Sequence, residues 1–182
     1  MKMLLVRNDF DDTQIICDVF RSLFKTVKIS EESNYIVFYF SYDDDSDIIS
    51  TLNALETELV KNIHAYLSIN RPEGKLGKEL EIAISLMDNL PIGIYGLKNA
   101  LLKSSKIENK NKVLNFILDN SSISIDFIRD FCQNDLNVSR ASKNMFIHRN
   151  TMIYKLNKLK INSGFDLTNF KDAYILYSLL EK

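Results

Sequence analysis

The sequence predicts an α+β protein: a ferredoxin-like module at the N-terminus, followed by an all-α domain built around a helix-turn-helix. Three observations lead to this prediction. Hydrophobic residues between positions 3 and 96 follow strand and helix spacing in the order βαββαβαβ. After Gly96 the strand patterns stop and only helical patterns follow. The charge also reverses, because residues 1–104 contain 11 basic and 16 acidic side chains, whereas residues 105–182 contain 12 and 8.

The overall composition is that of an ordinary globular protein. With 182 residues, of which 46% are hydrophobic and 26% charged, the chain can bury one sizeable core or two small ones. No apolar run approaches the roughly 20 residues that span a bilayer, and the first residues lack the regions of a signal peptide. We therefore expect a cytoplasmic protein with no membrane partner. Two isolated histidines and two distant cysteines have no metal-ligand spacing, and we expect Cys17 and Cys132 to be buried free thiols.

The N-terminal module is expected to open as strand, helix, strand, strand. Met3–Val6 is apolar throughout, and Thr13–Phe24 has apolar residues at helical spacing. Thr26–Ile29 and Tyr35–Phe40 have strand patterns and flank Glu31–Asn34, a polar segment of hairpin length.

A run of acidic residues, Asp43–Asp47, precedes a helix expected over residues 48–60. Acidic residues at a helix start supply N-caps and stabilise the macrodipole, and we prefer this interpretation to a metal site. The remaining elements are expected to be a strand, a turn, a helix and a closing strand: Ile63–Ile69, Arg71–Gly74, Leu80–Met87 and Pro91–Gly96. A hairpin and two crossovers in this order favour a ferredoxin-like sheet with helices packed on one face.

The domain boundary is expected in the polar, lysine-rich segment 103–111. This places the first domain at residues 1–102 and the second at residues 112–182. The helices expected beyond Gly96 are Leu97–Leu102, Lys112–Leu118, Ile123–Cys132, Val138–Met145, Arg149–Leu159 and Phe170–Leu180.

Two of these helices have the spacing of a helix-turn-helix. Val138, Ser142 and Met145 form one inward stripe, and Met152, Leu156 and Leu159 form the other. Ser142 supplies a small side chain where the second helix crosses the first closely. Phe146 lies in the turn, at a position where many such motifs have glycine.

The outward face of this motif has residue types that bind DNA. Arginine donates two hydrogen bonds to guanine, asparagine pairs with adenine, the threonine methyl group contacts thymine, and lysines bind phosphates. His148 at the helix start is equally well explained as a structural cap. The stretch between Asp135 and Asp166 contains six basic residues and no acidic one, which indicates a polyanionic partner. The predicted DNA-binding residues are Ser139, Arg140, Lys143, His148, Arg149, Asn150, Thr151, Tyr154, Lys155 and Lys158.

The segments Phe146–Leu159 and Gly164–Phe170 resemble the C-terminal domain of the PucR/CdaR family of bacterial transcription regulators. The run His148–Thr151 is the most specific part of the resemblance, which covers roughly residues 112–182. The second helix is also similar, more distantly, to that of the nucleoid protein Fis. The resemblance implies a winged or extended helix-turn-helix that activates or represses catabolic genes. It also implies that a sensor domain usually lies before these two, so we expect the sensory input to be absent or to lie elsewhere.

The same resemblance implies that the first module is a degenerate GGDEF-like domain, in agreement with the ferredoxin-like order of elements. The resemblance places the Gly-Gly-Asp-Glu-Phe signature in a hairpin that corresponds to Glu31–Asn34 here. This segment does not contain the signature, so a nucleotide cyclase would lack its glycines and its acidic ligand there. We therefore expect no catalytic residues, no cofactor and no enzymatic activity.

These observations together lead to the hypothesis of a sequence-specific transcription regulator whose helix 149–159 reads the major groove of double-stranded DNA, as a homodimer on a partly palindromic site. Two alternatives stay open. The basic helix docks on an acidic protein in a non-catalytic signalling module, or residues 1–96 retain an activity related to cyclic dinucleotides. The sequence does not identify a small-molecule effector.

Overall fold

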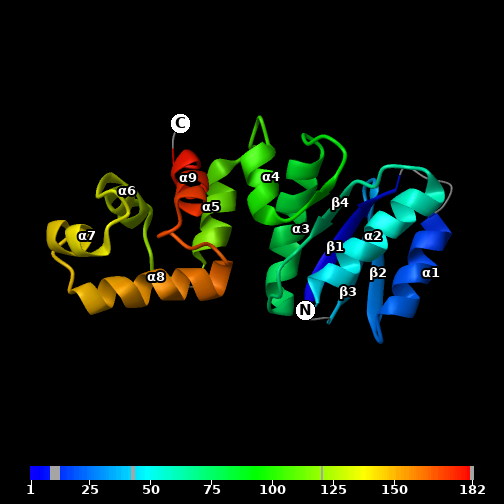
Figure 1. Cartoon of the computed structure of the whole chain (residues 1–182), viewed down its shortest axis with the longest axis horizontal. Coiled ribbons are helices and arrows are strands. Elements are labelled where there is room, and N and C mark those ends of the chain that lie inside the picture. Colours follow the sequence, from blue (N-terminus) through cyan, green and yellow to red (C-terminus); the bar gives the residue numbers. More distant parts are fainter. Residues whose placement is uncertain (9–12, 42–43, 120, 181–182) are drawn as a thin grey trace. The chain divides into compact units, whose positions relative to one another are not determined.

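The computed structural model describes residues 1–8, 13–41, 44–119 and 121–180. The chain divides into two compact units, residues 1–106 and 107–182 (Figure 1). The first unit contains both strands and helices, and the described part of the second consists of helices and their connections.

The N-terminal unit has the predicted element order. Its elements are β1 (Lys2–Arg7), α1 (Thr13–Leu23), β2 (Val27–Glu32), β3 (Tyr35–Phe40), α2 (Asp45–Leu59), β4 (Ala65–Leu67), α3 (Glu73–Met87), β5 (Ile94–Tyr95) and α4 (Leu97–Lys103). Strands β4 and β5 are shorter than the expected 63–69 and 91–96, and the boundaries of α3 and β2 also differ from the expectation. Helix α3 begins at Glu73, because Pro72 suits a helix start and Gly74 and Gly77 are tolerated within the helix. Strand β2 continues through Glu32, so the hairpin turn is only Ser33–Asn34, with Ser33 at φ 54°.

The five strands form one mixed sheet in the order β2-β3-β1-β4-β5. Strand β1 lies in the centre and pairs antiparallel with β3 and β4, with Leu5 opposite Val37 and Tyr66. Strand β2 pairs antiparallel with β3, whereas β5 is parallel to β4. The long crossover through α3 makes this last parallel pairing possible.

Helices cover both faces of this sheet. Leu4 and Val6 of β1 lie in one apolar core with residues of α1 and α2. Met3 and Leu5 point the opposite way and are also fully buried. On that side the Tyr66 hydroxyl donates to Glu79 of α3 at 2.7 Å. The expectation of helices on one face is therefore wrong for α3. Every residue from Met3 to Val6 is apolar, and such a strand needs cover on both sides.

The face under α3 contains a buried polar cluster. Glu79 is fully buried, accepts from the Tyr66 hydroxyl and forms an ion pair with the Arg71 guanidinium. Burial raises the pKa of the Glu79 carboxyl, although the Arg71 charge and both hydrogen bonds lower it. Burial also raises the pKa of the Tyr66 hydroxyl well above its ordinary value, and the Glu79 charge adds to this effect. Both oxygens of the Glu79 carboxylate therefore have a hydrogen-bond partner in this layer.

The acidic run before α2 acts as a helix cap. The Asp44 carboxylate accepts from the Ser46 backbone N–H at 2.8 Å and from its hydroxyl at 2.6 Å, and Asp45 forms an ion pair with Lys2 at 2.6 Å. Asp43 lies outside the described residues. Throughout the described ranges, nowhere do three or more His, Cys, Asp or Glu side chains gather in a way that could hold a metal ion. Within the same ranges, every helix is too short or too polar to cross a membrane.

The C-terminal unit contains α5 (Lys110–Leu118), α6 (Ile125–Gln133), α7 (Val138–Asn144), α8 (Arg149–Ser163) and α9 (Phe170–Ser178). Residues 107–119 and 121–180 contain no strand, so of the two expected kinds this helix-turn-helix is extended rather than winged. Helix α8 continues to Ser163, four residues beyond the predicted end, because Gly164 at φ 80° is the first position that stops it.

Candidate nucleic-acid interface

Helices α7 and α8 form the helix-turn-helix, and small residues set their close crossing. Met152, Leu156 and Leu159 of α8 are buried as predicted. On α7 the buried residues are Ala141 and the predicted Ser142. Val138 and Met145 are only half-buried. The sequence analysis missed Ala141, although it is adjacent to Ser142 and equally small.

The turn between the two helices is a Schellman motif. The Phe146 backbone N–H donates to the Lys143 carbonyl at 3.2 Å, and the Ile147 N–H donates to the Ser142 carbonyl at 2.9 Å. Phe146 has φ 54°, in the left-handed region that this motif requires at the position after the helix end. The turn therefore keeps glycine geometry without having a glycine, and the Phe146 side chain is 97% exposed.

Side chains cap the starts of both helices. The Asn137 side chain accepts from the Arg140 N–H at 3.0 Å and begins α7. The His148 Nδ1 accepts from the Asn150 N–H at 3.2 Å and begins α8. The cap interpretation of His148 is therefore confirmed. Because the His148 ring is also exposed, it can still reach a ligand at the helix start.

The outward face of α8 is a row of polar side chains. Arg149, Asn150 and Thr151 are exposed in the first turn, and Tyr154, one turn further along, is 64% exposed. Asn157 continues this row and is exposed, but the sequence analysis did not include it. Its position seven residues after Asn150, and therefore on the same helix face, was a signal that could have identified it.

Two predicted residues lie on the flank of α8 rather than on this outward row. The Lys155 ammonium donates to the Ser122 carbonyl at 2.8 Å and lies 5.7 Å from the Phe127 ring centroid. The Lys158 ammonium donates to the Ser122 hydroxyl at 2.8 Å. Positions 155 and 158 face the start of α6, which explains why both side chains are half-buried.

The predicted residues of α7 are exposed but not all equally available. Arg140 forms an ion pair with Asp135, which compensates part of its charge. Ser139 and Lys143 are exposed, and the Ser139 carbonyl accepts from the Ser142 hydroxyl at 3.1 Å. Lys143 and Ser139 are therefore the better candidates for a phosphate contact from this helix.

An ion pair anchors the far end of α8. The Lys160 ammonium donates to the Asp166 carboxylate at 2.8 Å, and the Thr168 hydroxyl and N–H donate to the other carboxylate oxygen at 2.6 and 3.0 Å. The Lys160 and Thr168 hydrogen bonds lower the pKa of the Asp166 carboxyl to about 2. This anchor connects the end of α8 to the segment that leads into α9.

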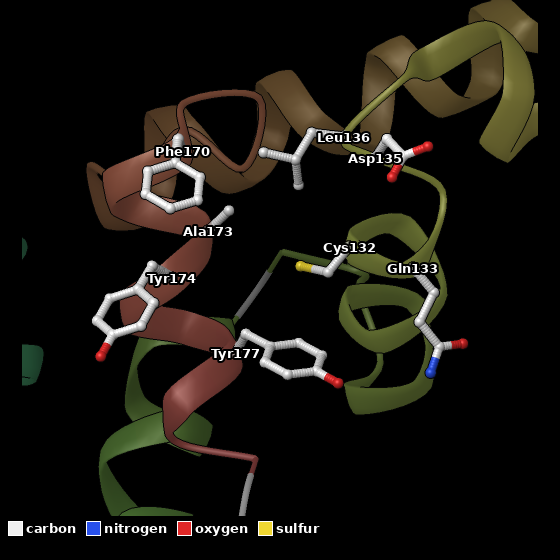
Figure 2. Close-up of a pocket in the computed structure, with 8 residues that line it drawn as sticks. All are labelled: Cys132, Gln133, Asp135, Leu136, Phe170, Ala173, Tyr174 and Tyr177. Carbon is white, nitrogen blue, oxygen red and sulfur yellow. The ribbon is translucent and has the colours of Figure 1, made fainter.

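A pocket of about 450 Å³ lies elsewhere in the same unit, between the end of α6 and one side of α9 (Figure 2). Phe170, Tyr174 and Tyr177 line it from α9, and Cys132 points into it from α6. Cys132 is half-buried rather than fully buried as predicted, and burial raises the pKa of its thiol to about 11. Cys17 is buried and free, as predicted. None of the residues that line this pocket belongs to α8.

Comparison with known proteins identifies the arrangement. Residues 125–181 match the family described as the PucR C-terminal helix-turn-helix domain. These residues form a PucR-type helix-turn-helix domain. In this chain the PucR-type domain spans α6 to α9, and the row on α8 lies at its centre. The resemblance inferred from residues 146–170 is thus confirmed.

Two relatives are regulators by name. The carbohydrate diacid regulator of Escherichia coli (strain K12) is 34% identical over 64 residues, which cover 35% of this chain and 17% of the relative. The proline-responsive transcriptional activator PutR of Bacillus subtilis (strain 168) is 23% identical over 175 residues, covering 80% of this chain and 43% of the relative. The chain thus spans less than half the length of each of these relatives.

A solved structure, the regulator of polyketide synthase expression from Bifidobacterium adolescentis, is also similar. The matched region covers 99% of this chain and 78% of the chain in that structure, with 17% sequence identity and a TM-score of 0.47.

Proposed function

We propose that this chain is a sequence-specific, DNA-binding transcription regulator that inserts the start of α8 into the major groove. The observation that carries the proposal is the exposed row on α8, which belongs to a PucR-type domain and lies in a stretch without acidic residues. A major groove about 12 Å wide admits one helix, and the side chains of its first turns then reach the base edges.

Each residue of the row has a role that its chemistry supports. Arg149 donates two hydrogen bonds to a guanine, and Asn150 pairs with an adenine. The Thr151 methyl group contacts a thymine, while Tyr154 and Asn157 extend the contact along the groove. His148 has the double role of capping α8 and facing the DNA. These side chains are exposed on one helix, so a single docking geometry can use all of them.

Basic side chains beside the row supply affinity for the phosphates. Lys143 lies on α7 and is exposed. Lys155 and Lys158 are held against Ser122, which orders their ammonium groups near the start of α6 before DNA arrives. Arg140 and Ser139 complete the backbone contacts from α7. Such contacts set the orientation of the protein and carry no sequence information.

The N-terminal unit is proposed to be a non-catalytic module of ferredoxin-like, degenerate GGDEF-like fold. The antiparallel order β2-β3-β1-β4, with β1 and β2 joined through α1, supports this assignment. The hairpin sequence Glu31–Asn34 supports the lack of cyclase chemistry. We further propose that the protein acts in the cytoplasm as a homodimer, which would place two α8 helices about 34 Å apart on a partly palindromic site.

The test is to select bound fragments from genomic DNA with the whole chain and to measure its affinity for the enriched site. We expect the logarithm of the affinity to fall linearly with the logarithm of the salt concentration. We also expect at least roughly a thousandfold preference over a scrambled duplex of equal composition. Arg149→Ala should weaken binding by about 1–3 kcal/mol and relax the preference at one base pair.

Lys171→Ala is the matched control, because Lys171 is an exposed cation of α9 outside the row. It should leave the preference unchanged. Equal affinity for the enriched and scrambled duplexes would contradict the proposal. A basic helix that binds any polyanion through its charge alone does not discriminate between the two duplexes.

A further inference from the structure

We propose that Phe146, in the turn before α8, is a specificity residue whose ring contacts the 5-methyl group of a thymine beside the bases that α8 reads. The inference rests on the proposed function, because it extends the DNA contact to a residue outside the helix. It is carried by the backbone of the turn, by the exposure of the ring and by its position next to the exposed row.

The backbone at Phe146 would be more stable with glycine. The residue occupies the left-handed position of a Schellman motif, and both hydrogen bonds of that motif are present. Glycine adopts this conformation without a steric penalty, whereas a Cβ atom crowds the following carbonyl oxygen. An aromatic residue at this φ therefore strains the turn, and strained positions of this kind gather at ligand-binding sites.

The ring gains nothing from the fold that would offset this strain. Phe146 is 97% exposed, while the neighbouring Met145 and Ile147 are half-buried. Its side chain leaves the helix-turn-helix core altogether. Folding alone thus gives no reason for a large apolar side chain at this position.

The position of Phe146 indicates which ligand the ring meets. It precedes by two residues His148, which caps α8, and by three Arg149, which begins the exposed row. A helix that enters the major groove by its first turn brings this turn to the groove edge. Among the four bases, thymine presents an apolar group there, its 5-methyl group.

Val60 shows why strain and exposure are not sufficient. It also has a left-handed backbone, at φ 53°, and an exposed apolar side chain. However, it ends α2 in the N-terminal unit and is followed by Lys61 and Asn62 rather than by a DNA-binding helix. Among the residues that the structure describes, only Phe146 has a left-handed backbone, an exposed apolar side chain and a position next to the exposed row of α8.

The experiment combines a backbone-compatible variant with single-thymine substitutions. Phe146→Gly should raise or preserve the melting temperature of the whole chain, because glycine relaxes the turn. It should nevertheless weaken binding to the enriched site by about tenfold. The duplex probes replace each thymine of that site by uracil, one at a time, which removes only the methyl group. At one of these positions, uracil should weaken binding of the wild type by about the same factor. The same uracil substitution should not weaken binding of Phe146→Gly any further.

Phe170→Ala is the matched control, since Phe170 is an exposed aromatic residue of α9. It should bind like the wild type. If Phe146→Gly binds as tightly as the wild type, the residue has no role and the inference is wrong. If binding weakens but no uracil substitution distinguishes the two proteins, the ring does not contact a thymine methyl group. If the wild type itself prefers no DNA sequence, the proposed function fails first.

Discussion

Replacing Asp166 with asparagine tests the anchor between the end of α8 and the start of α9. The carboxylate accepts from Lys160 and from Thr168, and its pKa falls from the ordinary 3.8 to about 2. One pKa unit corresponds to 1.36 kcal/mol, so the difference between 3.8 and about 2 means that the charged form contributes at most about 2.4 kcal/mol to folding. Asparagine still accepts from Thr168, and we therefore expect Asp166→Asn to lose about 1–2 kcal/mol at pH 7.

The pH dependence of that loss of stability shows whether it comes from the removed charge or from altered packing. A carboxyl whose pKa is lower in the folded state stabilises the fold fully above pH 3.8, and this contribution disappears as the pH falls towards 2. Urea unfolding followed by far-UV circular dichroism at several pH values should show wild type and Asp166→Asn converging across that window.

The control is Asp18→Asn, which removes an exposed ion pair with Arg21 in α1 and should change little. A difference between wild type and Asp166→Asn that stays constant from pH 7 down to pH 2 would refute the electrostatic explanation, and so would no difference at pH 7.

Three further predictions concern groups that packing buries fully or in part. Leu156→Ala leaves a cavity under α8 and should destabilise the helical unit by about 2–5 kcal/mol in urea unfolding, with weaker DNA binding near the midpoint. Glu79→Gln leaves the Arg71 charge buried and should destabilise the N-terminal unit by about 3–5 kcal/mol, whereas adding Arg71→Met should restore most of the loss. In a Cys17→Ser background, Cys132 should react slowly with iodoacetamide at pH 8, and its rate should keep rising to about pH 11; a plateau near pH 9 would contradict its burial.

Local patterns were sufficient to predict the order of elements in the N-terminal unit. Continuous runs of β-branched and aromatic residues such as Tyr35–Phe40, and amphipathic runs such as Thr13–Leu23, each specify one element with no information from elsewhere. The position of α3 on the second face was harder, because it depends on tertiary contacts. Its signal was the unbroken apolar run Met3–Val6, which alternates in direction and so buries both faces.

Buried polar pairings were beyond the reach of the sequence. Arg71 and Glu79 are eight residues apart, one in the connection between β4 and α3 and one within α3, and both are residue types that normally face solvent. Nothing in their local pattern indicates burial. Only the packing of α3 over Tyr66 brings the three groups together.

In the helix-turn-helix, too, the local pattern could be predicted from the sequence, whereas the tertiary contacts could not. The apolar positions Met152, Leu156 and Leu159 defined the inward side of α8, and this side was predicted correctly. The remaining positions were then treated as one outward face, although a helix in contact with two neighbours has flanks as well. Lys155 and Lys158 lie on the flank towards α6, which an analysis of α7 and α8 alone does not include.

This flank changes how the proposed interface works. If Lys155 and Lys158 pointed into the groove, they would compete with Asn150 and Tyr154 for the base edges. Held against Ser122, they instead leave the outward row to side chains that discriminate among bases and place positive charge beside it. In the proposed interface, sequence reading and phosphate attraction thus belong to different sides of one helix. It follows that Lys158→Ala should weaken binding to enriched and scrambled duplexes by similar factors, whereas Asn150→Ala should reduce the ratio between them.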